Sequence, residues 1–191
     1  MEACRITAAN LACRRGDRVL FAGLSLELKG GQACHVAGPN GLGKSSLIRL
    51  LAGLARPFAG SVERVGMAGL LDERPALDEH QPLGPALAFW GKLDPASVPL
   101  EELGLADLLD VPVRYLSTGQ RKRAALARLI GQAAPIWLLD EPLNGLDAAA
   151  VEMVQALVAR HCENGGIALI ASHQPFAIPG LMRLELQEFA R

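Results

Sequence analysis

The stretch Gly38-Pro39-Asn40-Gly41-Leu42-Gly43-Lys44-Ser45-Ser46 decides the fold of this chain. Its first eight residues match the pattern G-x-x-x-x-G-K-[ST]. The stretch follows a short apolar run at 32–37 and precedes residues 44–54, where apolar side chains recur at helical spacing. The sequence therefore predicts a buried strand, a glycine-rich loop and a helix, one after the other.

This order of elements suits the phosphate groups of a nucleotide. Glycines let successive backbone N–H groups turn inward, and the first turn of the helix adds its positive dipole end. The Lys44 ammonium can reach the β- and γ-phosphates, and the Ser45 hydroxyl can bind Mg²⁺. A glycine-rich turn without a ligand is the structural alternative, and the position of the loop between strand and helix disfavours it.

A second group of polar residues stands at the end of the apolar run 136–139, where Asp140 and Glu141 follow directly. Ligands of parallel sheets bind beyond the carboxyl ends of the strands, so Asp140 can approach Mg²⁺ directly or through water. Glu141 is then available to orient or deprotonate the attacking water. Without the loop upstream, the same pair would be read as an acidic start to a helix.

Apolar runs and helical patterns alternate along most of the chain. The expected strands lie at 11–13, 19–28, 32–37, within 61–71, 136–139 and 167–171, and the expected helices at 44–54, 120–131 and 148–161. A turn at Gly16-Asp17 joins the first two strands. Strands that alternate with helices of this length indicate an α/β fold with a largely parallel sheet covered on both faces.

The middle third of the chain has a different composition, because six prolines between 75 and 112 limit it to short helices. The 191 residues fit a single domain, 1–191. We expect a nucleotide-binding core from 1–72 and 120–191, with 73–119 as a smaller helical part.

Charge and composition exclude several classes of protein. Nineteen Lys and Arg against twenty Asp and Glu give a net charge of -1, so nothing favours binding to nucleic acid. No apolar run approaches the roughly 18–20 residues that span a bilayer, so membrane association would depend on a partner. Four cysteines without a C-x-x-C pair fit a reduced, cytoplasmic setting.

The segment Leu116-Ser117-Thr118-Gly119-Gln120 separates the nucleotide-binding families. It resembles the signature of the ATP-binding subunits of ABC transporters, usually LSGGQ, with Thr118 in place of the first glycine. The resemblance implies a P-loop NTPase fold with a RecA-like lobe, a helical signature subdomain and an N-terminal antiparallel β part. It also implies that Ser117, Gly119 and Gln120 receive the γ-phosphate of ATP bound to a second copy, so ATP binding would produce a homodimer.

Two further segments of the same family occur in the expected order. Residues 144–147, Asn-Gly-Leu-Asp, resemble the D-loop at the dimer interface, which places Asp147 near the nucleotide. Ser172-His173 resembles the switch histidine that contacts the γ-phosphate. The resemblance, over about residues 5 to 186, thus assigns catalytic roles to Lys44, Glu141 and His173.

Two segments depart from the family pattern. The Q-loop glutamine, a ligand of Mg²⁺, is replaced by Glu73 in the ungapped match, and Gln81 is the nearest glutamine. The A-loop aromatic that stacks on adenine is missing from residues 13–17. The guanidinium of Arg14 or of Arg15 is the candidate to stack on the base instead.

Three strings narrow the resemblance further: residues 13–21, 38–57 and 171–174. They are similar to the ATP-binding subunit of bacterial cytochrome c maturation systems, which are haem exporters. The resemblance implies a subunit at the cytoplasmic face of the inner membrane, bound to a membrane-spanning permease. Phe89 and Trp90 are candidate anchors for that partner, or alternatively core residues.

The ATPase subunit of another small ABC exporter remains an alternative, and so do two other classes of protein. A soluble ABC ATPase that acts on ribosomes or DNA would usually carry tandem cassettes or a coiled-coil insertion. A small-molecule kinase would need an acceptor pocket and a lid but no LSTGQ-like signature.

Overall fold

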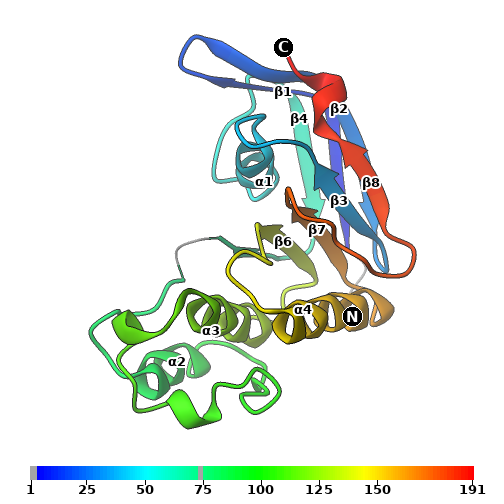
Figure 1. Cartoon of the computed structure of the whole chain (residues 1–191). Helices are drawn as coiled ribbons and strands as arrows, with labels where there is room; N and C mark the ends of the chain where they lie inside the picture. The colour runs from blue at the N-terminus through cyan, green and yellow to red at the C-terminus, as the bar shows by residue number, and fades with distance from the viewer. Residues whose placement is uncertain (1–3, 73–74) are drawn as a thin grey trace.

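The computed structural model describes residues 4–72 and 75–191, which form two β-sheets with helices packed against them (Figure 1). The strands are β1 (Arg5–Arg15), β2 (Arg18–Lys29), β3 (Ala33–Ala37), β4 (Ala59–Val65), β5 (Ala68–Leu71), β6 (Ile136–Asp140), β7 (Ile167–Ala171) and β8 (Met182–Glu185). The α-helices are α1 (Lys44–Leu51), α2 (Leu83–Gly91), α3 (Thr118–Gly131) and α4 (Ala148–Glu163). The predicted role of Glu73 lies outside the described residues.

The larger sheet has the strand order β5-β6-β7-β3-β8, and each pair of neighbours in it is parallel. Every residue of β3 and β7 is buried, and so is every residue of β6 except Asp140. Burial on both faces explains why these strands are continuous apolar runs in the sequence. The predicted α/β class with a mainly parallel sheet and an N-terminal antiparallel part is confirmed.

The smaller sheet, of order β2-β1-β4, is antiparallel. Gly16 turns the chain between β1 and β2 with a φ of 59°. Strand β1 is much longer than the predicted 11–13, because its first half faces the core through Ile6 and Ala8, a pattern too weak to identify a strand. A register shift near Asn10, which has a φ of 50°, also interrupts its alternation.

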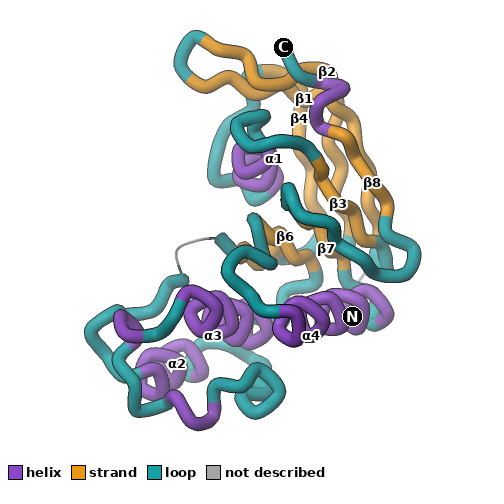
Figure 2. Tube along the Cα trace, viewed as in Figure 1, coloured by secondary structure: helices purple, strands orange, loops and turns teal. Residues whose placement is uncertain are grey.

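Two hydrophobic clusters lie on opposite faces of the parallel sheet. One joins α1 and the antiparallel sheet to the side of the sheet that carries Cys34 and Val36. The other joins α3 and α4 to the side that carries Ala33 and Trp137. Figure 2 shows α1 beside the antiparallel sheet and α3 and α4 together on the other side of β6 and β7. The loops that follow β3, β6 and β7 therefore meet at one edge.

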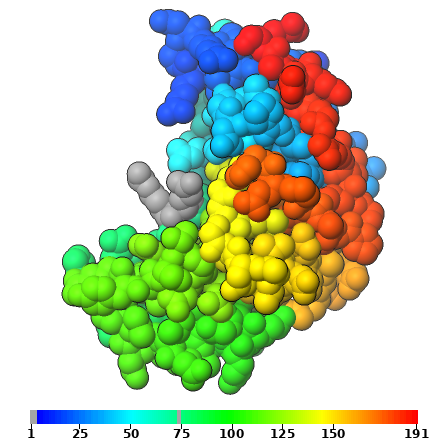
Figure 3. All heavy atoms as spheres, viewed as in Figure 1, coloured from blue at the N-terminus to red at the C-terminus, as the bar shows by residue number. Residues whose placement is uncertain are grey.

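The proline-rich middle of the chain contains α2, nine residues long, and short 3₁₀ turns at Ala106–Leu108 and Val113–Tyr115. This part, green in Figure 3, extends from the core next to α3. Arg128 of α3 contacts this part directly, because it forms an ion pair with Asp94 and stacks on Trp90 at 3.8 Å from the ring centroid. The short helices expected here are present.

Two parts of the sheets differ from the prediction. The strand expected within 61–71 is β5, and the range also holds most of a second strand, β4, which belongs to the other sheet and is separated from β5 by Gly66, whose φ is 100°. Strand β8 was not predicted; its four residues are all at least partly exposed, and it pairs with the edge of β3. Within the described ranges, no helix is both long and apolar enough to cross a membrane.

Candidate nucleotide-binding site

The loop between β3 and α1 has the backbone that a phosphate cradle requires. Gly38, Gly41 and Gly43 have φ values of 143°, 85° and 101°, in the region that favours glycine. A Cβ on Gly43 would lie 3.1 Å from a methyl of Leu20, so the loop also packs closely on β2. Helix α1 begins at Lys44 without a side-chain cap, which leaves the N–H groups of its first turn to an anion.

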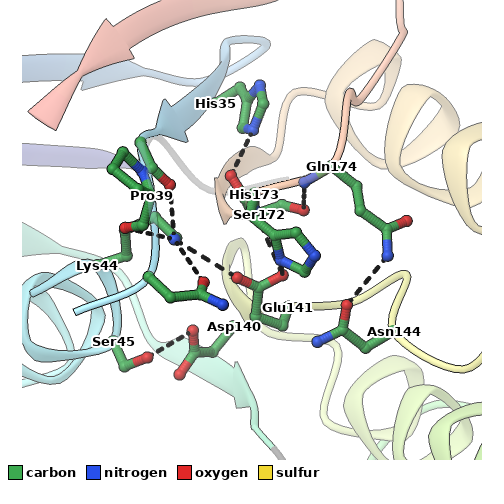
Figure 4. Close-up of polar contacts among 12 residues, drawn as sticks. His35, Pro39, Lys44, Ser45, Asp140, Glu141, Asn144, Ser172, His173 and Gln174 are labelled. Carbon is green, nitrogen blue, oxygen red and sulfur yellow. Dashed lines mark hydrogen bonds and ion pairs between the residues drawn. The ribbon is translucent and has the colours of Figure 1, made fainter. Parts of the chain in front are cut away.

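The Lys44 side chain is buried and points back into this loop (Figure 4). Its Nζ donates to the carbonyl oxygens of Gly38 at 2.8 Å and Pro39 at 3.2 Å, and to Oδ1 of Asn40 at 3.3 Å. It also lies 3.7 Å from Oε1 of Glu141. The ammonium therefore stands in the centre of the loop, where the phosphates of a nucleotide would meet it.

Ser45 and Asp140 form the candidate magnesium pair. The Ser45 hydroxyl donates to Oδ1 of Asp140 at 3.0 Å. Burial raises the pKa of Asp140, opposed by this hydrogen bond, and the nearby carboxylates of Glu141 and Asp72 raise it further. A divalent cation would offset that cost, and hard oxygen ligands suit Mg²⁺, which takes one or two protein ligands together with phosphate and water.

Asp72 is a residue of this site that sequence reasoning missed. It lines the same cavity as Ser45 and Asp140. Its position at the carboxyl end of β5 was the available signal, because the neighbouring strand β6 ends at Asp140. Among the residues that the structure describes, no cluster of three or more His, Cys, Asp and Glu side chains forms a metal site.

Glu141 stands where three loops meet. Its Oε2 lies 2.9 Å from Nδ1 of His173, and its N–H donates to the carbonyl of Ala171 at 2.8 Å. Its φ of 46° is unusual for a residue with a side chain and is typical of functional sites. The structure thus brings together the three predicted catalytic residues, Lys44, Glu141 and His173, from the loops after β3, β6 and β7.

Two adjoining cavities lie over this group. One, of about 330 Å³, is lined by residues of the glycine loop together with Ser46, Glu141 and His173. The other, of about 570 Å³, extends from Ser45 and Asp140 along α1. Ser46 lines both cavities.

The two arginines considered for the base differ in their surroundings. Arg15 lines both cavities, whereas Arg14 lines only the larger one. The Arg14 guanidinium lies over the ring of Phe58, 4.6 Å from its centroid. Both arginines were candidates from the sequence, whereas Phe58 was missed as an aromatic side chain near Arg14. Little in the sequence pointed to Phe58, because it lies 44 positions after Arg14. The pairing of Ala12 with Ala59 brings the two residues together.

The signature segment begins α3 in a capping box. The Ser117 hydroxyl accepts from the Gln120 N–H at 3.2 Å, and the Gln120 side chain accepts from the Ser117 N–H at 2.8 Å. A Cβ on Gly119 would lie 2.9 Å from the carbonyl oxygen of Gly145, so the signature packs directly on the D-loop. Asp147 caps α4 by accepting from the Ala150 N–H at 2.8 Å. Neither Ser117 nor Gly119 lines the two cavities over Lys44.

Known proteins resemble this chain over its whole length. Residues 21–144 match the family model described as ABC transporter. The "Cytochrome c biogenesis ATP-binding export protein CcmA" of Novosphingobium aromaticivorans is 59% identical over 189 residues, 99% of each chain. The protein of the same name from Sphingopyxis alaskensis is 53% identical, over 91% of this chain and 92% of that one.

The chain belongs to the CcmA family of ABC transporter ATP-binding proteins. Solved structures share the fold: an ABC transporter ATP-binding protein from Pyrococcus furiosus has a TM-score of 0.83 at 18% identity, over 98% of this chain and all of that one. A metal-chelate-type ABC transporter gives 0.78 at 25% identity, over 96% of this chain and 80% of that one. Membership makes the chain an ABC-type ATPase, as the sequence predicted.

Gln81, the nearest glutamine to the Q-loop position, lies away from the candidate magnesium site. Gln81 lines a different cavity, together with Ala76 and Phe89, and not the one at Ser45 and Asp140. The Gln81 carbonyl accepts from the Val113 N–H at 3.0 Å, which connects Gln81 to the 3₁₀ turn at Val113–Tyr115. Gln81 therefore does not line the cavity at the candidate magnesium pair, and its Q-loop role stays an untested alternative.

The aromatic pair on α2 is divided between surface and core. Phe89 is 57% exposed. Trp90 is partly buried; its Nε1 donates to the Ala76 carbonyl at 2.5 Å, and its ring carries Arg128. Trp90 therefore packs within the protein. Of the two, only Phe89 is exposed enough to contact a partner.

Proposed function

We propose that this chain is the ATP-hydrolysing subunit of a haem exporter that serves cytochrome c biogenesis. The observation that carries the proposal is the 59% identity, over 99% of both chains, to a protein named as a cytochrome c biogenesis ATP-binding export protein. Haem as the cargo follows from the resemblance of residues 13–21 and 171–174 to cytochrome c maturation systems.

The partner in this proposal is a membrane-spanning permease, and the chain lies at the cytoplasmic face of the inner membrane through it. Exposed apolar side chains on the helical part support such a contact: Phe89, Leu93 and Tyr115 are each more than half exposed. Apolar and aromatic side chains of this kind are enriched in the centres of interfaces.

A homodimer that forms on ATP binding is the second part of the proposal. Lys44 and Ser45 bind the nucleotide from one side, but Ser117 and Gly119 of the same chain lie outside both cavities. The N-terminus of α3 offers its dipole and backbone N–H groups to an anion. A second copy would bring its own α3 over the γ-phosphate and complete each site.

Each residue of the site then has a distinct role in hydrolysis. Lys44 and the glycine-loop N–H groups bind the phosphates, while Ser45 and Asp140 hold Mg²⁺, which neutralises phosphate charge when bound. Glu141 accepts a proton from the attacking water, and His173 orients that carboxylate through its 2.9 Å contact. The glycine loop and the loops after β6 and β7 hold these groups in place, so little reorganisation is needed during the reaction.

Genetic complementation tests the exporter function. The CcmA gene of Novosphingobium aromaticivorans would be deleted and this chain supplied in its place, with covalent haem on c-type cytochromes as the readout. We expect the wild-type chain and the exposed-surface control Lys29→Ala to restore haem attachment, and Lys44→Ala to fail. Equal expression of the three chains with no restoration by the wild type would contradict the proposal.

A further inference from the structure

His35 is a buried histidine for which the family signatures assign no role. It lies in the middle of β3, between β7 and β8, and is only 5% exposed. Alternation along the strand puts it on the same face as Ala33, toward the cluster that includes α4. A buried imidazole is costly unless its polar atoms are hydrogen-bonded, so its contacts indicate why it is there.

Nε2 of His35 lies 3.1 Å from the carbonyl oxygen of Ser172 (Figure 4). Because that partner can only accept, Nε2 is the donor. Ser172 is also held at its other polar groups: its N–H donates to the Val36 carbonyl at 3.3 Å, and its hydroxyl accepts from the Gln174 N–H at 2.9 Å. The backbone that leaves β7 is therefore fixed at one residue by three hydrogen bonds.

The residue after Ser172 is His173, whose Nδ1 contacts Glu141. Further along, Phe176 is buried in the core cluster on the same side of the sheet as His35. His173, itself 40% exposed, thus lies between a polar anchor at Ser172 and an apolar anchor at Phe176. Gln174 adds a link to the D-loop, because its amide donates to Oδ1 of Asn144 at 3.2 Å.

We propose that His35 is a positioning residue of the hydrolytic site, which holds the Ser172 carbonyl and thereby sets the place of the His173 imidazole against Glu141. The inference rests on the assignment of ATP hydrolysis to this group of residues. Without the imidazole donor, the Ser172 carbonyl would be left buried and unpaired, and the backbone would move to find a partner. A shift of about 1 Å at His173 is enough to lower the rate of a positioned reaction strongly.

His161 provides a matched control within the same chain. It is another buried histidine whose Nε2 contacts a backbone carbonyl, that of Ile167 at 3.2 Å, and its ring stacks on Trp137. It lies in the last turns of α4 and lines none of the nucleotide cavities. A change at His161 therefore perturbs the core without touching the segment that carries His173.

The experiment compares four variants of the full chain with the wild type: His35→Leu and His35→Met, which fill the space without a donor; His35→Gln, which keeps an N–H donor; and His161→Leu. The readouts are kcat and KM for Mg-ATP, the urea midpoint, and hydrogen exchange of the Gln174 backbone N–H, which donates to the Ser172 hydroxyl. Met is included because its flexible side chain fills irregular space if Leu prevents folding.

We expect kcat to fall about tenfold in the two apolar variants, with KM changed less than about twofold and faster exchange at Gln174. His35→Gln should keep kcat within about threefold of the wild type. His161→Leu should lower the urea midpoint and leave both kcat and exchange at Gln174 unchanged.

The inference is overturned if a folded apolar variant keeps the wild-type kcat, if His35→Gln is as slow as His35→Leu, or if His161→Leu loses activity to the same extent. A wild-type chain that hydrolyses no ATP would instead count against the assigned hydrolytic group. In that case exchange at Gln174 still decides the role of His35, because it reports the position of the segment without turnover.

Discussion

The Nδ1 atom of His173 lies 2.9 Å from Oε2 of Glu141, at the meeting point of the loops after β6 and β7. The other carboxylate oxygen of Glu141 lies 3.7 Å from Nζ of Lys44, so the candidate base is held between a histidine and a lysine. Phosphates that enter the loop would compete for the lysine. Binding would then free one side of the carboxylate to face the attacking water.

Replacement of Lys44 should abolish most of the ATPase activity and leave the fold intact. Among the described residues, its Nζ contacts the loop carbonyls, Asn40 and Glu141, and no core side chain. For Lys44→Ala we expect kcat/KM to fall at least about a hundredfold, or about 2.7 kcal/mol of transition-state stabilisation. Steady-state ATPase assays beside circular dichroism measure this, with Lys29→Ala as the control; activity near the wild type would refute the role.

Selectivity for adenine should be weak, because no aromatic side chain stands in residues 13–17. A stacking contribution of about 1–3 kcal/mol, the value for bases on aromatic rings, is missing. We expect the dissociation constants for ATP and GTP to differ less than about tenfold. Arg15→Ala should weaken both more than Arg14→Ala, because Arg15 lines both cavities. A preference for ATP above about a hundredfold would mean that another residue reads the base.

Gly119 should not tolerate a side chain. A Cβ there would lie 2.9 Å from the Gly145 carbonyl oxygen, so Gly119→Ala would push the signature away from the D-loop. We expect about 1–3 kcal/mol of destabilisation and a marked loss of ATPase activity. Gly91→Ala is the matched control, since a Cβ at that helical glycine meets nothing within 4 Å. Urea unfolding and ATPase assays on both variants decide, and equal behaviour of the two would contradict the close packing.

His161 should make the fold less stable in mild acid. Burial lowers its pKa from 6.5 to about 4, opposed by its hydrogen bond to the Ile167 carbonyl. Between these values the unfolded chain binds a proton that the folded chain does not, so the free energy of unfolding falls as the pH falls through this window. The slope from this one group is about 1.4 kcal/mol per pH unit.

The comparison variant for that window is His161→Phe, which keeps a ring against Trp137. Urea midpoints at pH 7 and pH 5 should fall more for the wild type than for the variant. Carboxylates titrate alike in both proteins, so the difference isolates His161. Parallel curves would show that His161 is already protonated in the folded chain at pH 5.

Much of the site was predictable because its residues lie in short sequence motifs that directly follow apolar runs. The glycine loop, the Asp140-Glu141 pair and Ser172-His173 all directly follow apolar runs that became β3, β6 and β7. Strand β7 was predicted with the bounds that the structure gives, 167–171. The helical pattern at 120–131 became α3, in which Ala124, Ala125, Leu126 and Leu129 are all buried. Continuous burial in a parallel sheet produces patterns that are visible without a structure.

The features that were missed depend on contacts between distant segments. Strand β8 has four partly exposed residues, so only its pairing with β3 identifies it. Arg14 and Arg15 are adjacent in sequence, yet only Arg14 lies over Phe58 and only Arg15 lines the smaller cavity. His35 gave no sign of its contact with Ser172, 137 positions away. Such contacts are tertiary, and local pattern carries no information about them.

The central claim is that ATP is bound between two copies of this chain, with Lys44 from one and Ser117 from the other. Glu141→Gln removes the base and keeps the shape of the side chain, so the variant should bind Mg-ATP and hydrolyse it slowly. The decisive measurement is the mass of this variant by light scattering with saturating Mg-ATP, beside the double variant Glu141→Gln/Ser117→Arg. The account predicts twice the 20.2 kDa of one chain for the single variant and a monomer for the double variant. A monomer in the first case, or a dimer that persists with arginine at position 117, would contradict it.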